Sequence, residues 1–412
     1  MAERSTNSTQ RRVLIIVENL PVPFDRRVWL EATTLARNNY AVSVICPKAK
    51  GLNAAYERLE DIDIYRYPVP VDAGGALGFI VEFAWCFLAS AWLSLKIALF
   101  GRGFDVIHAC NPPDSFWLLG LFWRPFGRRF IFDHHDLCPE MYAAKFEREG
   151  GFFYKALLWL ERRAFRTARV VITTNESHKR IAVERGGKDP DDVFVVRSGP
   201  DLKRFRRYEP DLQYRRGKPH LLVYLGEICK QDGVDHLVRA VKALRDDLGR
   251  KDFVCLFVGG GPHQPAIKAY AEAEGVMDVA DFTGRVSDEA LCRILSSATI
   301  GVDPDPKNPW SDKSTMNKVV EYMYFGLPVV AYDLHETRVS AADAGIYAEA
   351  NSEIALARAI DALLNDTTQQ AAMAERGETR VRNTLAWDHS VAPLLAAYDK
   401  AFGEAPVPAP AG

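Results

Sequence analysis

The residues best suited to chemistry lie in segment 311–334, where a polar loop leads into a short helical pattern and then a buried strand. The first turn of a helix leaves backbone N–H groups unpaired and carries the positive end of the peptide dipoles, so it attracts anions. Ser314 and Thr315 add hydroxyl donors there, and Lys313 and Lys318 add positive charge. The segment therefore predicts a phosphate-binding turn.

Glu321 lies three residues beyond Lys318, on nearly the same face of the expected helix. A carboxylate beside a phosphate site is suited to accept hydrogen bonds from sugar hydroxyls. The alternative is an ordinary capped helix that packs on a sheet. This segment alone leaves both interpretations open.

The chain has 412 residues, enough for two domains of about 200 residues each. Lys and Arg outnumber Asp and Glu in residues 1–205, whereas the remainder is acidic. Seven cysteines are scattered without a CxxC pair, which argues against a disulfide framework or a zinc site and favours the cytosol. No apolar segment precedes the first strand pattern, so a secretion signal is not expected.

Buried-strand runs alternate with helical patterns along most of the chain, and the pattern restarts after Phe205. This alternation predicts an α/β fold of two Rossmann-like, doubly wound domains. The expected strands are 12–17, 40–47, 61–69, 104–110, 129–135, 169–175, 220–226, 252–260, 279–286, 299–305 and 328–333. Helices are expected near 29–39, 233–248, 263–275 and 288–298.

Domain boundaries follow from the same pattern. Residues 1–205 are expected to form the first domain, 206–218 a polar linker and 219–385 the second domain. A helix over 386–402 is expected to pack back on the first domain, and the Pro- and Ala-rich residues 403–412 to form a disordered tail.

The longest apolar run, 79–100, is long enough to cross a bilayer as a helix. Helical geometry places Glu82, Ser90 and Lys96 toward one half of that helix. The other half carries Trp85, Leu88, Trp92, Leu95 and Leu99. An amphipathic helix lying in the membrane interface is therefore favoured over a spanning one. The alternative is a core helix that covers the first sheet.

Two further segments of the first half, 115–129 and 152–166, combine apolar residues with several arginines. Tryptophans on an apolar face, such as Trp85 and Trp92, are typical of positions at the level of lipid headgroups. Because all three segments lie in the basic domain, we expect this domain to dock peripherally on an anionic membrane surface. For any one charged cluster the alternative is a solvated face.

Several motifs resemble those of family 4 glycosyltransferases of the GT-B fold, and the resemblance runs from Val13 to near Phe402. They are VENLPVPFDRRVWLEATTLARNNYAVSVICP, FDVIHACNPPD, IFDHHDLCPE, VVRSGPDLKRF, LGEICKQDGVDHLVRAV, FVGGGP and KVVEYMYFGLPVVAYD. The resemblance implies two Rossmann-like domains facing a central cleft, the first facing an acceptor and the second binding a nucleotide-sugar donor. It also implies transfer with retention of anomeric configuration, a UDP-sugar being favoured and a GDP-sugar next.

Position by position, Glu321 matches the second glutamate of the family's E-x7-E motif, which binds the ribose hydroxyls. The first glutamate would fall at Lys313, with Asp312 adjacent. The two cations that contact the diphosphate in the first turn of the family's second domain correspond to Glu227 and Asp232.

Two carboxylates in place of two cations would repel a diphosphate unless other cations compensate. The resemblance therefore implies that Lys230, Lys313 and Lys318 supply the positive charge. Replacing Lys318 with Ala is expected to abolish activity with little change in the thermal midpoint.

His135 and Asp136 match the histidine and aspartate that the family carries at the cleft edge, where the imidazole approaches the donor sugar. The adjacent His134 leaves the assignment open. Arg26 and Arg27 would reach phosphate or a phospholipid-like acceptor, the alternative being two solvent-exposed arginines at a helix start.

These considerations assign roles as follows. The catalytic candidates are His135, Asp136, Asp312 and Lys313. The donor-binding candidates are Lys230, Gly259, Gly260, Gly261, Ser314, Thr315, Lys318 and Glu321. The acceptor or membrane candidates are Arg26, Arg27, Trp85 and Trp92. No metal requirement and no bound cofactor besides the nucleotide-sugar co-substrate are expected, because Asp303-Pro304-Asp305 is only a weak match to a DxD metal motif.

A membrane-docked helix would make a lipid-linked acceptor plausible and would place the protein on the cytoplasmic face of the membrane, in surface polysaccharide or glycolipid assembly. A nucleic-acid partner is not expected, because the basic residues lie with apolar helices. The alternatives are a nucleotide-sugar epimerase or phosphorylase on the same fold, and a non-catalytic nucleotide-sugar-binding or scaffold subunit. A dinucleotide-dependent dehydrogenase is disfavoured, because GxGxxG follows none of the strands.

Overall fold

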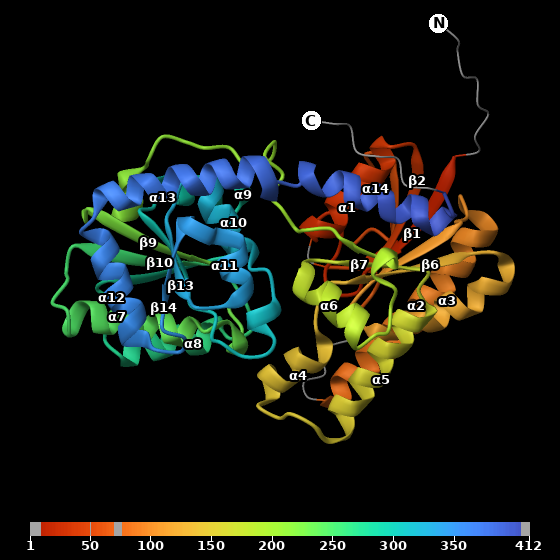
Figure 1. The fold of residues 1–412 in the computed structure, drawn as a ribbon, viewed down its shortest axis with the longest axis horizontal. Coiled ribbons are helices and arrows are strands. Elements are labelled where there is room, and N and C mark those ends of the chain that lie inside the picture. The colour runs from red at the N-terminus through yellow and green to blue at the C-terminus, as the bar shows by residue number, and fades with distance from the viewer. Residues whose placement is uncertain (1–9, 50, 70–75, 405–412) are drawn as a thin grey trace, which may run out of the picture. The chain divides into compact units, whose positions relative to one another are not determined.

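The computed structural model describes residues 10–49, 51–69 and 76–404, which divide into two compact units (Figure 1). Unit 1 comprises Met1–Met141, Glu149–Arg197 and Ser390–Gly412. Unit 2 comprises Tyr142–Arg148 and Ser198–His389. Of the tail predicted over 403–412, residues 405–412 lie outside the described residues.

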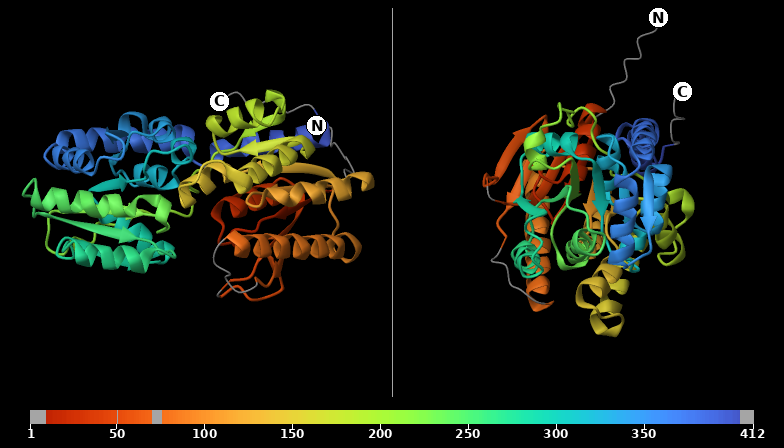
Figure 2. Two further views of the ribbon diagram at one scale, coloured as in Figure 1. Left: turned by 90° about the horizontal axis from the view of Figure 1, so that it is seen from below. Right: turned by 90° about the vertical axis from the view of Figure 1, so that its left-hand side faces the viewer.

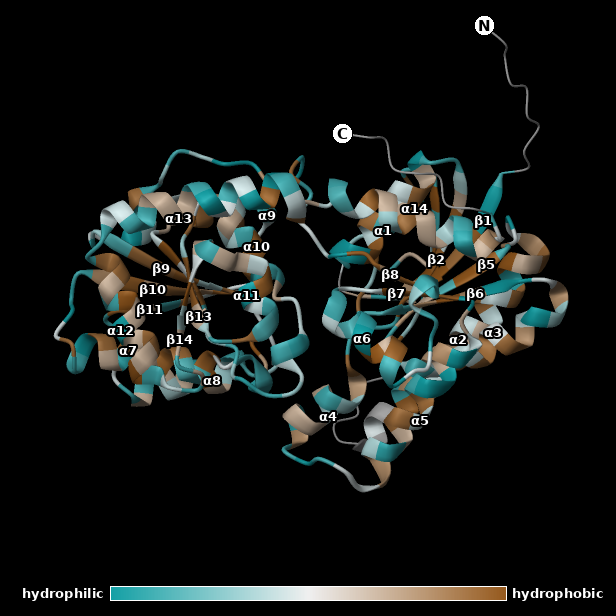
Figure 3. Cartoon of the chain, viewed as in Figure 1, coloured by the Kyte–Doolittle hydropathy of each residue, from teal (hydrophilic) through white to brown (hydrophobic). Residues whose placement is uncertain are grey.

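An eight-stranded sheet forms the centre of unit 1, in the order β3-β4-β2-β1-β5-β6-β7-β8. All neighbouring strands are parallel except β3 and β4, which pair antiparallel. The strands are β1 (Arg11–Ile16), β2 (Tyr40–Pro47), β3 (Tyr56–Leu59), β4 (Ile62–Tyr67), β5 (Val106–Cys110), β6 (Arg129–His134), β7 (Val170–Thr173) and β8 (Val193–Val195). The central strands are largely apolar, as a parallel sheet covered on both faces requires, apart from the buried His108 of β5 and Asp133 and His134 of β6 (Figure 3).

Helices cover both faces of this sheet (Figures 1 and 2). One face carries α1 (Arg26–Arg37) and α14 (Asp388–Phe402). The other carries α2 (Ala76–Phe100), α3 (Trp117–Trp123), α5 (Gly151–Thr167) and α6 (Glu176–Glu184). Helix α4 (Cys138–Phe146) lies between β6 and α5 in the chain. Asp25 begins α1, because its carboxylate accepts a hydrogen bond from Val28 N at 3.0 Å.

Unit 2 contains a six-stranded parallel sheet in the order β11-β10-β9-β12-β13-β14. Its strands are β9 (His220–Leu225), β10 (Phe253–Val258), β11 (Ala280–Gly284), β12 (Ile300–Asp303), β13 (Val329–Tyr332) and β14 (Gly345–Ala348). Its helices are α7 (Val234–Asp246), α8 (Gln264–Ala273), α9 (Asp288–Ser297), α10 (Asn317–Tyr324), α11 (His335–Ala341), α12 (Glu353–Leu364) and α13 (Thr367–Arg380). Two buried clusters, one on each face of the sheet, form its core.

Each sheet has a point where the order of its strands reverses. In unit 1 this point is β1, which pairs with β2 on one side and β5 on the other. In unit 2 it is β9, between β10 and β12. Open parallel sheets bind ligands outside the carboxyl ends of the strands at such points. The residues that follow β1, β5, β9 and β12 are therefore placed where a ligand would bind.

The predicted α/β fold of two Rossmann-like domains is confirmed. The sequence pattern did not indicate the edge strands β3, β8 and β14, which are short or paired on one side only. In the segment expected to be a linker, Tyr208 and Tyr214 pack against the core of unit 2. Helix α14 packs on unit 1, where Tyr398 is fully buried and Asp399 pairs with Arg11 at 3.2 Å.

Helix α2 turns its small and polar side chains toward the sheet. Its buried residues are Cys86, Ser90, Ser94 and Ile97. The Tyr67 hydroxyl lies 2.9 Å from Cys86 Sγ, and Trp123 Nε1 donates to Ser94 Oγ at 3.1 Å. Ser90, expected on the polar half, is thus a buried residue.

The large apolar residues of α2 face outward. Leu88, Trp92 and Leu99 are 63, 68 and 71% exposed. Among the described residues, Val81–Phe100 is a helix long and apolar enough to cross a membrane by length and composition, and 22% of it is buried. Only one narrow face of α2 is therefore buried as in a core helix, and the rest of its described residues are partly or fully exposed.

Glu18, just after β1, yields a prediction about the pH dependence of stability. Desolvation, reinforced by the Glu82 carboxylate of α2, raises the pKa of Glu18 from 4.5 to about 7. A carboxyl pKa raised by folding means that the free energy of unfolding falls as the pH rises from about 4.5 through 7. We expect Glu18→Gln to stabilise the protein by on the order of 1–3 kcal/mol at pH 8 and by little at pH 4.5. Urea unfolding at both pH values measures this, with exposed Glu184→Gln as the control; equal effects at both would contradict it.

Candidate functional site

The glycine turn after β10 touches the turn after β9. A Cβ atom on Gly259 would lie 1.8 Å from Gly226 O, and one on Gly261 would lie 2.5 Å from Ile228 O. Ile228 N donates to Gly260 O at 2.9 Å. Glycine is required here because two backbones pack against each other. That the backbone of these glycines also lies close to a nucleotide base stays a prediction.

Lys318, in the first turn of α10, is held by carboxylates at the end of β12. Its ammonium donates to Asp303 Oδ1 at 3.3 Å and also to Asp305 Oδ2, and it lies 5.0 Å from the centroid of the Tyr224 ring. Both aspartates are buried. Burial alone would lower the pKa of Lys318, but the carboxylates, Asp305 first, outweigh it and raise that pKa. The charge expected to face a diphosphate is therefore shared with two buried aspartate side chains.

The candidates of the 311–315 loop turn largely toward their own backbone. Lys313 Nζ donates to Pro309 O at 3.1 Å, and Ser314 Oγ donates to Trp310 O at 2.8 Å. The loop is thus ordered by internal hydrogen bonds, in which the backbone N–H groups of Asp312, Lys313 and Ser314 also take part. Thr315 follows Ser314 just before α10.

Asp312 and Glu321 lie in different surroundings. The Asp312 carboxylate accepts a hydrogen bond from His335 N at 2.9 Å, at the start of α11, and lies 3.7 Å from Lys307 Nζ. Glu321 lies one helical turn after Lys318 and is 9% exposed. Glu321 and Lys318 thus lie one turn apart on α10, while Asp312 accepts a hydrogen bond from the start of the neighbouring helix α11.

Acidic residues occupy the turn after β9, where the family usually has cations. Asp232 accepts a hydrogen bond from Cys229 N at 2.9 Å and closes the short helix Lys230–Asp232. Desolvation and the nearby Asp232 raise the pKa of Glu227, whereas Arg285 and Lys145 act in the opposite direction. Arg285 follows β11 directly and lies beside Gly260. The sequence analysis missed this cation, because its strand is distant in the chain.

Lys230 lies apart from these groups. Its ammonium pairs with Glu147 at 2.7 Å, and both side chains are exposed. It lines a cavity of about 480 Å³ together with residues at the starts of α7 and α8, among them His236 and His263. The structure therefore does not bring Lys230 together with Lys318.

At the carboxyl edge of the first sheet, His135 points its Nε2 inward. This nitrogen lies 2.6 Å from Asp133 Oδ2 and 2.8 Å from Arg27 Nε. Asn111 Oδ1 accepts hydrogen bonds from the backbone N–H groups of His135 and Asp136, at 2.6 and 3.1 Å. The two residues are thus fixed at the end of β6 by both backbone and side-chain contacts.

Arg27 is buried, which corrects its predicted role at an acceptor or a phospholipid. Its guanidinium donates to Asp133 Oδ1 at 3.0 Å and to Val196 O at 2.7 Å, and it lies 3.1 Å from Glu31 Oε1. A buried carboxylate needs a counter-charge, and Arg27 supplies it. Arg26, its neighbour, is only partly buried.

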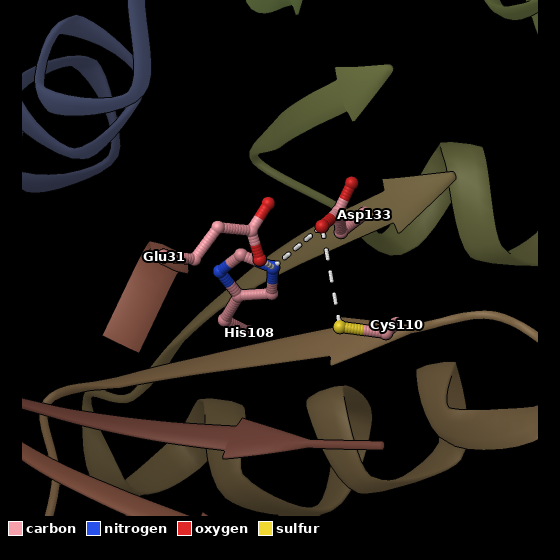
Figure 4. Close-up of side chains that lie close together, drawn as sticks. All are labelled: Glu31, His108, Cys110 and Asp133. Atoms are coloured by element: carbon pink, nitrogen blue, oxygen red, sulfur yellow. Dashed lines mark hydrogen bonds and ion pairs between the residues drawn. The ribbon is translucent and has the colours of Figure 1, made fainter. Parts of the chain in front are cut away.

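Four buried side chains gather behind His135 (Figure 4). They are Glu31 of α1, His108 and Cys110 of β5, and Asp133 of β6, whose potential ligand atoms all lie within 4.8 Å of one another. These residue types bind metals, but the Arg27 guanidinium already contacts both carboxylates. A fixed cation at this position disfavours a divalent ion, so we interpret the group as a hydrogen-bonded network.

Protonation states support that interpretation. Desolvation and the Asp133 carboxylate raise the pKa of Glu31, and burial raises that of the Cys110 thiol. Burial lowers the pKa of His108, which favours the neutral ring. Despite its burial, the charges of Arg27 and His135 hold the pKa of Asp133 well below its usual range. The Arg27 guanidinium and the Asp133 carboxylate therefore form an ion pair at the centre of this network.

The structure also resolves the ambiguity between two adjacent histidines. His134 is fully buried, with Nε2 3.4 Å from Glu161 and its ring packed against Phe165. His135 is the partly exposed one, so it remains the candidate. The alternation of residues along β6 decides this, because successive side chains point to opposite faces.

Three regions of unit 1 expose large apolar side chains on the face that carries α2, α3 and α5. Trp85, 43% exposed, donates its Nε1 to Pro68 O at 2.7 Å, and Trp92 is exposed two turns further along nearly the same face of α2. Trp117, at the start of α3, packs edge-on against Trp159 of α5 at 5.8 Å. The other exposed residues of this face include Leu118, Leu121, Phe122, Phe126, Phe152 and Phe153. We call these residues, with Leu88 and Leu99, the apolar face.

Comparison with known proteins identifies the family. Residues 25–204 match the model described as Glycosyltransferase Family 4, and residues 219–366 match the model described as Glycosyl transferases group 1. Together the two models cover most of the chain. The chain belongs to glycosyltransferase family 4. The resemblance seen in its motifs is thereby confirmed.

Several curated relatives are glycosyltransferases by name. The D-inositol 3-phosphate glycosyltransferase of Salinispora tropica is 27% identical over 241 residues, covering 54% of this chain and 49% of the relative. The GDP-mannose-dependent alpha-(1-6)-phosphatidylinositol monomannoside mannosyltransferase of Mycobacterium tuberculosis is 29% identical, over 48% of this chain and 53% of the relative. The family 4 chain thus matches about half the length of these relatives.

Solved structures show the same GT-B fold. A sucrose-phosphate synthase from Thermosynechococcus elongatus gives a TM-score of 0.77 at 18% identity, covering 95% of this chain and 99% of the other. Anabaena HepE, solved in complex with UDP-glucose, gives 0.70 at 14% identity, covering 94 and 99%. At these identities the likeness shows the fold.

The Lys318 cluster changes the expectation that Lys318 can be replaced without loss of stability. We expect Lys318→Met to lower the free energy of unfolding by about 3–5 kcal/mol, because Asp303 and Asp305 would stay buried without a counter-charge. The double variant Lys318→Met/Asp305→Asn should recover part of this loss. Urea unfolding followed by circular dichroism measures both. Lys242→Met, which removes only a surface ion pair with Glu274, is the control and should have little effect on stability; an equal cost in both single variants would contradict the prediction.

Proposed function

We propose that this protein is a retaining glycosyltransferase that moves a sugar from a nucleotide-sugar to a lipid-linked acceptor at the cytoplasmic surface of the membrane, in polysaccharide or glycolipid assembly. The observation that carries the proposal is that Lys318, at the start of α10, lies against the turn after β9, which packs on the glycine turn after β10 at the switch point of the second sheet. Glu321 lies one turn further along α10, and the chain belongs to family 4.

The donor is proposed to bind unit 2. Glu321 binds the ribose hydroxyls, and the N–H groups at the start of α10, with part of the Lys318 charge, bind the diphosphate. A solved neighbour holds UDP-glucose and a relative is named as GDP-mannose-dependent, so both donor classes have precedent. We propose a UDP-sugar first and a GDP-sugar next.

In a retaining transfer of this kind, the departing diphosphate oxygen takes the acceptor proton, so stabilising the leaving group matters more than a strong protein base. We propose that no metal is required. Asp303 and Asp305, which have the spacing of a DxD metal motif, support this because they already bind the Lys318 ammonium.

One observation favours a second candidate, a nucleotide-sugar-binding or scaffold subunit without catalysis. Carboxylates at 227, 232, 303 and 305 surround the place where the family holds a diphosphate, and the structure gives Lys318 to two of them. Like charges weaken diphosphate binding. Such a subunit would bind the nucleotide weakly and release nothing.

Donor turnover tests the proposal. We expect nucleotide release from one member of a panel of UDP- and GDP-sugars, increased by a lipid extract and unaffected by EDTA. In that reaction Glu321→Gln should raise the KM for the donor by about 10- to 100-fold, because it removes a hydrogen bond to a charged group. Glu375→Gln, on α13, is the matched control. Binding without release from any donor would favour the scaffold alternative.

The apolar face supports a membrane-bound acceptor. It runs over α2, α3 and α5, and Figure 2 shows these helices side by side on one side of unit 1. Exposed cations lie within the same elements, namely Lys96, Arg124, Lys155, Arg162 and Arg163. Outward-facing tryptophans and leucines with nearby cations suit the interface of an anionic bilayer. The mannosyltransferase relative is named for a phosphatidylinositol acceptor, which is itself a membrane lipid.

Vesicle binding tests this part of the proposal. We expect the protein to sediment with vesicles of phosphatidylcholine and phosphatidylglycerol, and less so with phosphatidylcholine alone. Leu88→Ser/Trp92→Ser should lower the partition coefficient by on the order of 10-fold or more, because two apolar side chains leave the interface. Leu212→Ser, an equally exposed leucine of unit 2, should have no effect. A dimer in solution that the double variant abolishes, without vesicle binding, would instead assign the face to a second copy of the chain.

A further inference from the structure

The contact of His135 with Asp133 raises the question of which imidazole nitrogen is available to a substrate. Nε2 lies 2.6 Å from Asp133 Oδ2 and 2.8 Å from Arg27 Nε. One nitrogen cannot both donate to the carboxylate and accept from the guanidinium, since it carries either a proton or a lone pair. The two contacts therefore correspond to two different tautomers of the neutral ring.

Electrostatics distinguishes the two tautomers. Asp133 is ionised, because the Arg27 guanidinium beside it holds its pKa well below the usual range. An unprotonated Nε2 would place its lone pair 2.6 Å from a carboxylate oxygen in a buried site, which is repulsive. A proton on Nε2 instead gives a short charge-assisted hydrogen bond. This choice turns the Arg27 Nε–H toward a second N–H group at 2.8 Å, a cost that the charge-assisted bond to Asp133 has to outweigh. The other N–H groups of the guanidinium still donate to Asp133 and Val196.

We propose that Asp133 is a positioning residue that holds His135 as its Nε2–H tautomer, so that Nδ1 is the nitrogen left to accept a hydrogen bond from a sugar hydroxyl. This inference rests on the proposed transferase function for the identity of the sugar. The tautomer itself follows from the geometry of unit 1 alone.

A chain of hydrogen bonds behind Asp133 keeps it in place. His108 Nε2 lies 3.1 Å from the same Asp133 oxygen, and His108 Nδ1 lies 2.7 Å from the Tyr398 hydroxyl. Because burial keeps His108 neutral, its Nε2–H donates to Asp133 and its Nδ1 accepts from Tyr398. The C-terminal helix α14 thus contributes a hydroxyl to the network that orients His135, although Tyr398 is far away in sequence.

The tautomer can be read directly in the wild-type protein. Long-range proton–nitrogen NMR of histidine-labelled protein, with His135→Asn used to assign the signals, distinguishes protonated from unprotonated ring nitrogens. We expect Nε2 of His135 to be protonated and Nδ1 unprotonated when the ring is neutral. A protonated Nδ1, with Arg27 donating to Nε2, would overturn the proposal, as would a ring that averages between both forms. This measurement needs neither substrate nor a buried substitution.

Two substitutions of His135 test which nitrogen acts. The amide of Asn reaches the position of Nδ1, whereas that of Gln reaches the position of Nε2. We therefore expect His135→Asn to keep about tenfold more kcat/KM than His135→Gln, since only the Asn variant can keep the hydrogen bond to the sugar hydroxyl. The opposite order would overturn the role of Nδ1.

Asp133→Asn tests the positioning role, since an amide can donate to Nε2 and favour the other tautomer. We expect kcat to fall about tenfold, as for the loss of one hydrogen bond, with little change in the donor KM, and the NMR signals to report a protonated Nδ1. Asp105→Asn, a carboxylate-to-amide change in the same unit where the carboxylate binds Arg12 and Arg128, should leave both readouts unchanged. An unchanged kcat after the tautomer has switched would refute the positioning role. If wild-type protein turns over no donor, the proposed function fails, and the wild-type NMR spectrum still decides the tautomer.

Discussion

The buried ion pair between Arg27 and Asp133 is the interaction on which the functional edge of unit 1 depends. Asp133 receives hydrogen-bond donors from α1, β5 and β6, and it keeps its charge only because the guanidinium lies beside it. Removing one partner of such a pair leaves an uncompensated charge in the core. The same pair fixes the ring of His135 and joins α1, β5 and β6 at their ends, so stability and the orientation of a candidate site residue are properties of one cluster.

In unit 2, different residues likewise place a cation beside buried carboxylates. Two aspartates at the end of β12 are buried, and Lys318 from the start of α10 neutralises them. In both units a cation near the start of a helix binds carboxylates at strand ends, where open α/β sheets bind their ligands. A cation at such a position therefore stabilises buried carboxylates whether or not a ligand is bound. In the proposed donor site, the positive groups are then the backbone N–H groups at the start of α10, the shared Lys318 ammonium, and Arg285. Arg285 is distant in the sequence but lies beside Gly260.

Helix α2 reverses the usual distribution of polar and apolar side chains between the inside and the surface of a protein. Its serines and a cysteine face the sheet, and its leucines and tryptophans face outward. The small inward side chains permit close packing, with Tyr67 and Trp123 bonding to them. An outward stripe of large apolar residues costs free energy in water and gains it in contact with another apolar phase. One side of α2 therefore packs on the sheet, and the opposite side forms part of the apolar face.

The sequence by itself determined the two parallel sheets, the family and the candidates His135, Lys318 and Glu321, because strand periodicity and motif spacing are local properties. It did not determine which candidates are already paired. Arg27 was expected at an acceptor and Lys318 at a phosphate, yet each meets its carboxylates across 106 and 15 positions of the chain. Tyr398 reaches His108 across 290 positions. Such pairings exist only after the strands are placed side by side, since burial then makes an unpaired charge too costly and selects its partner.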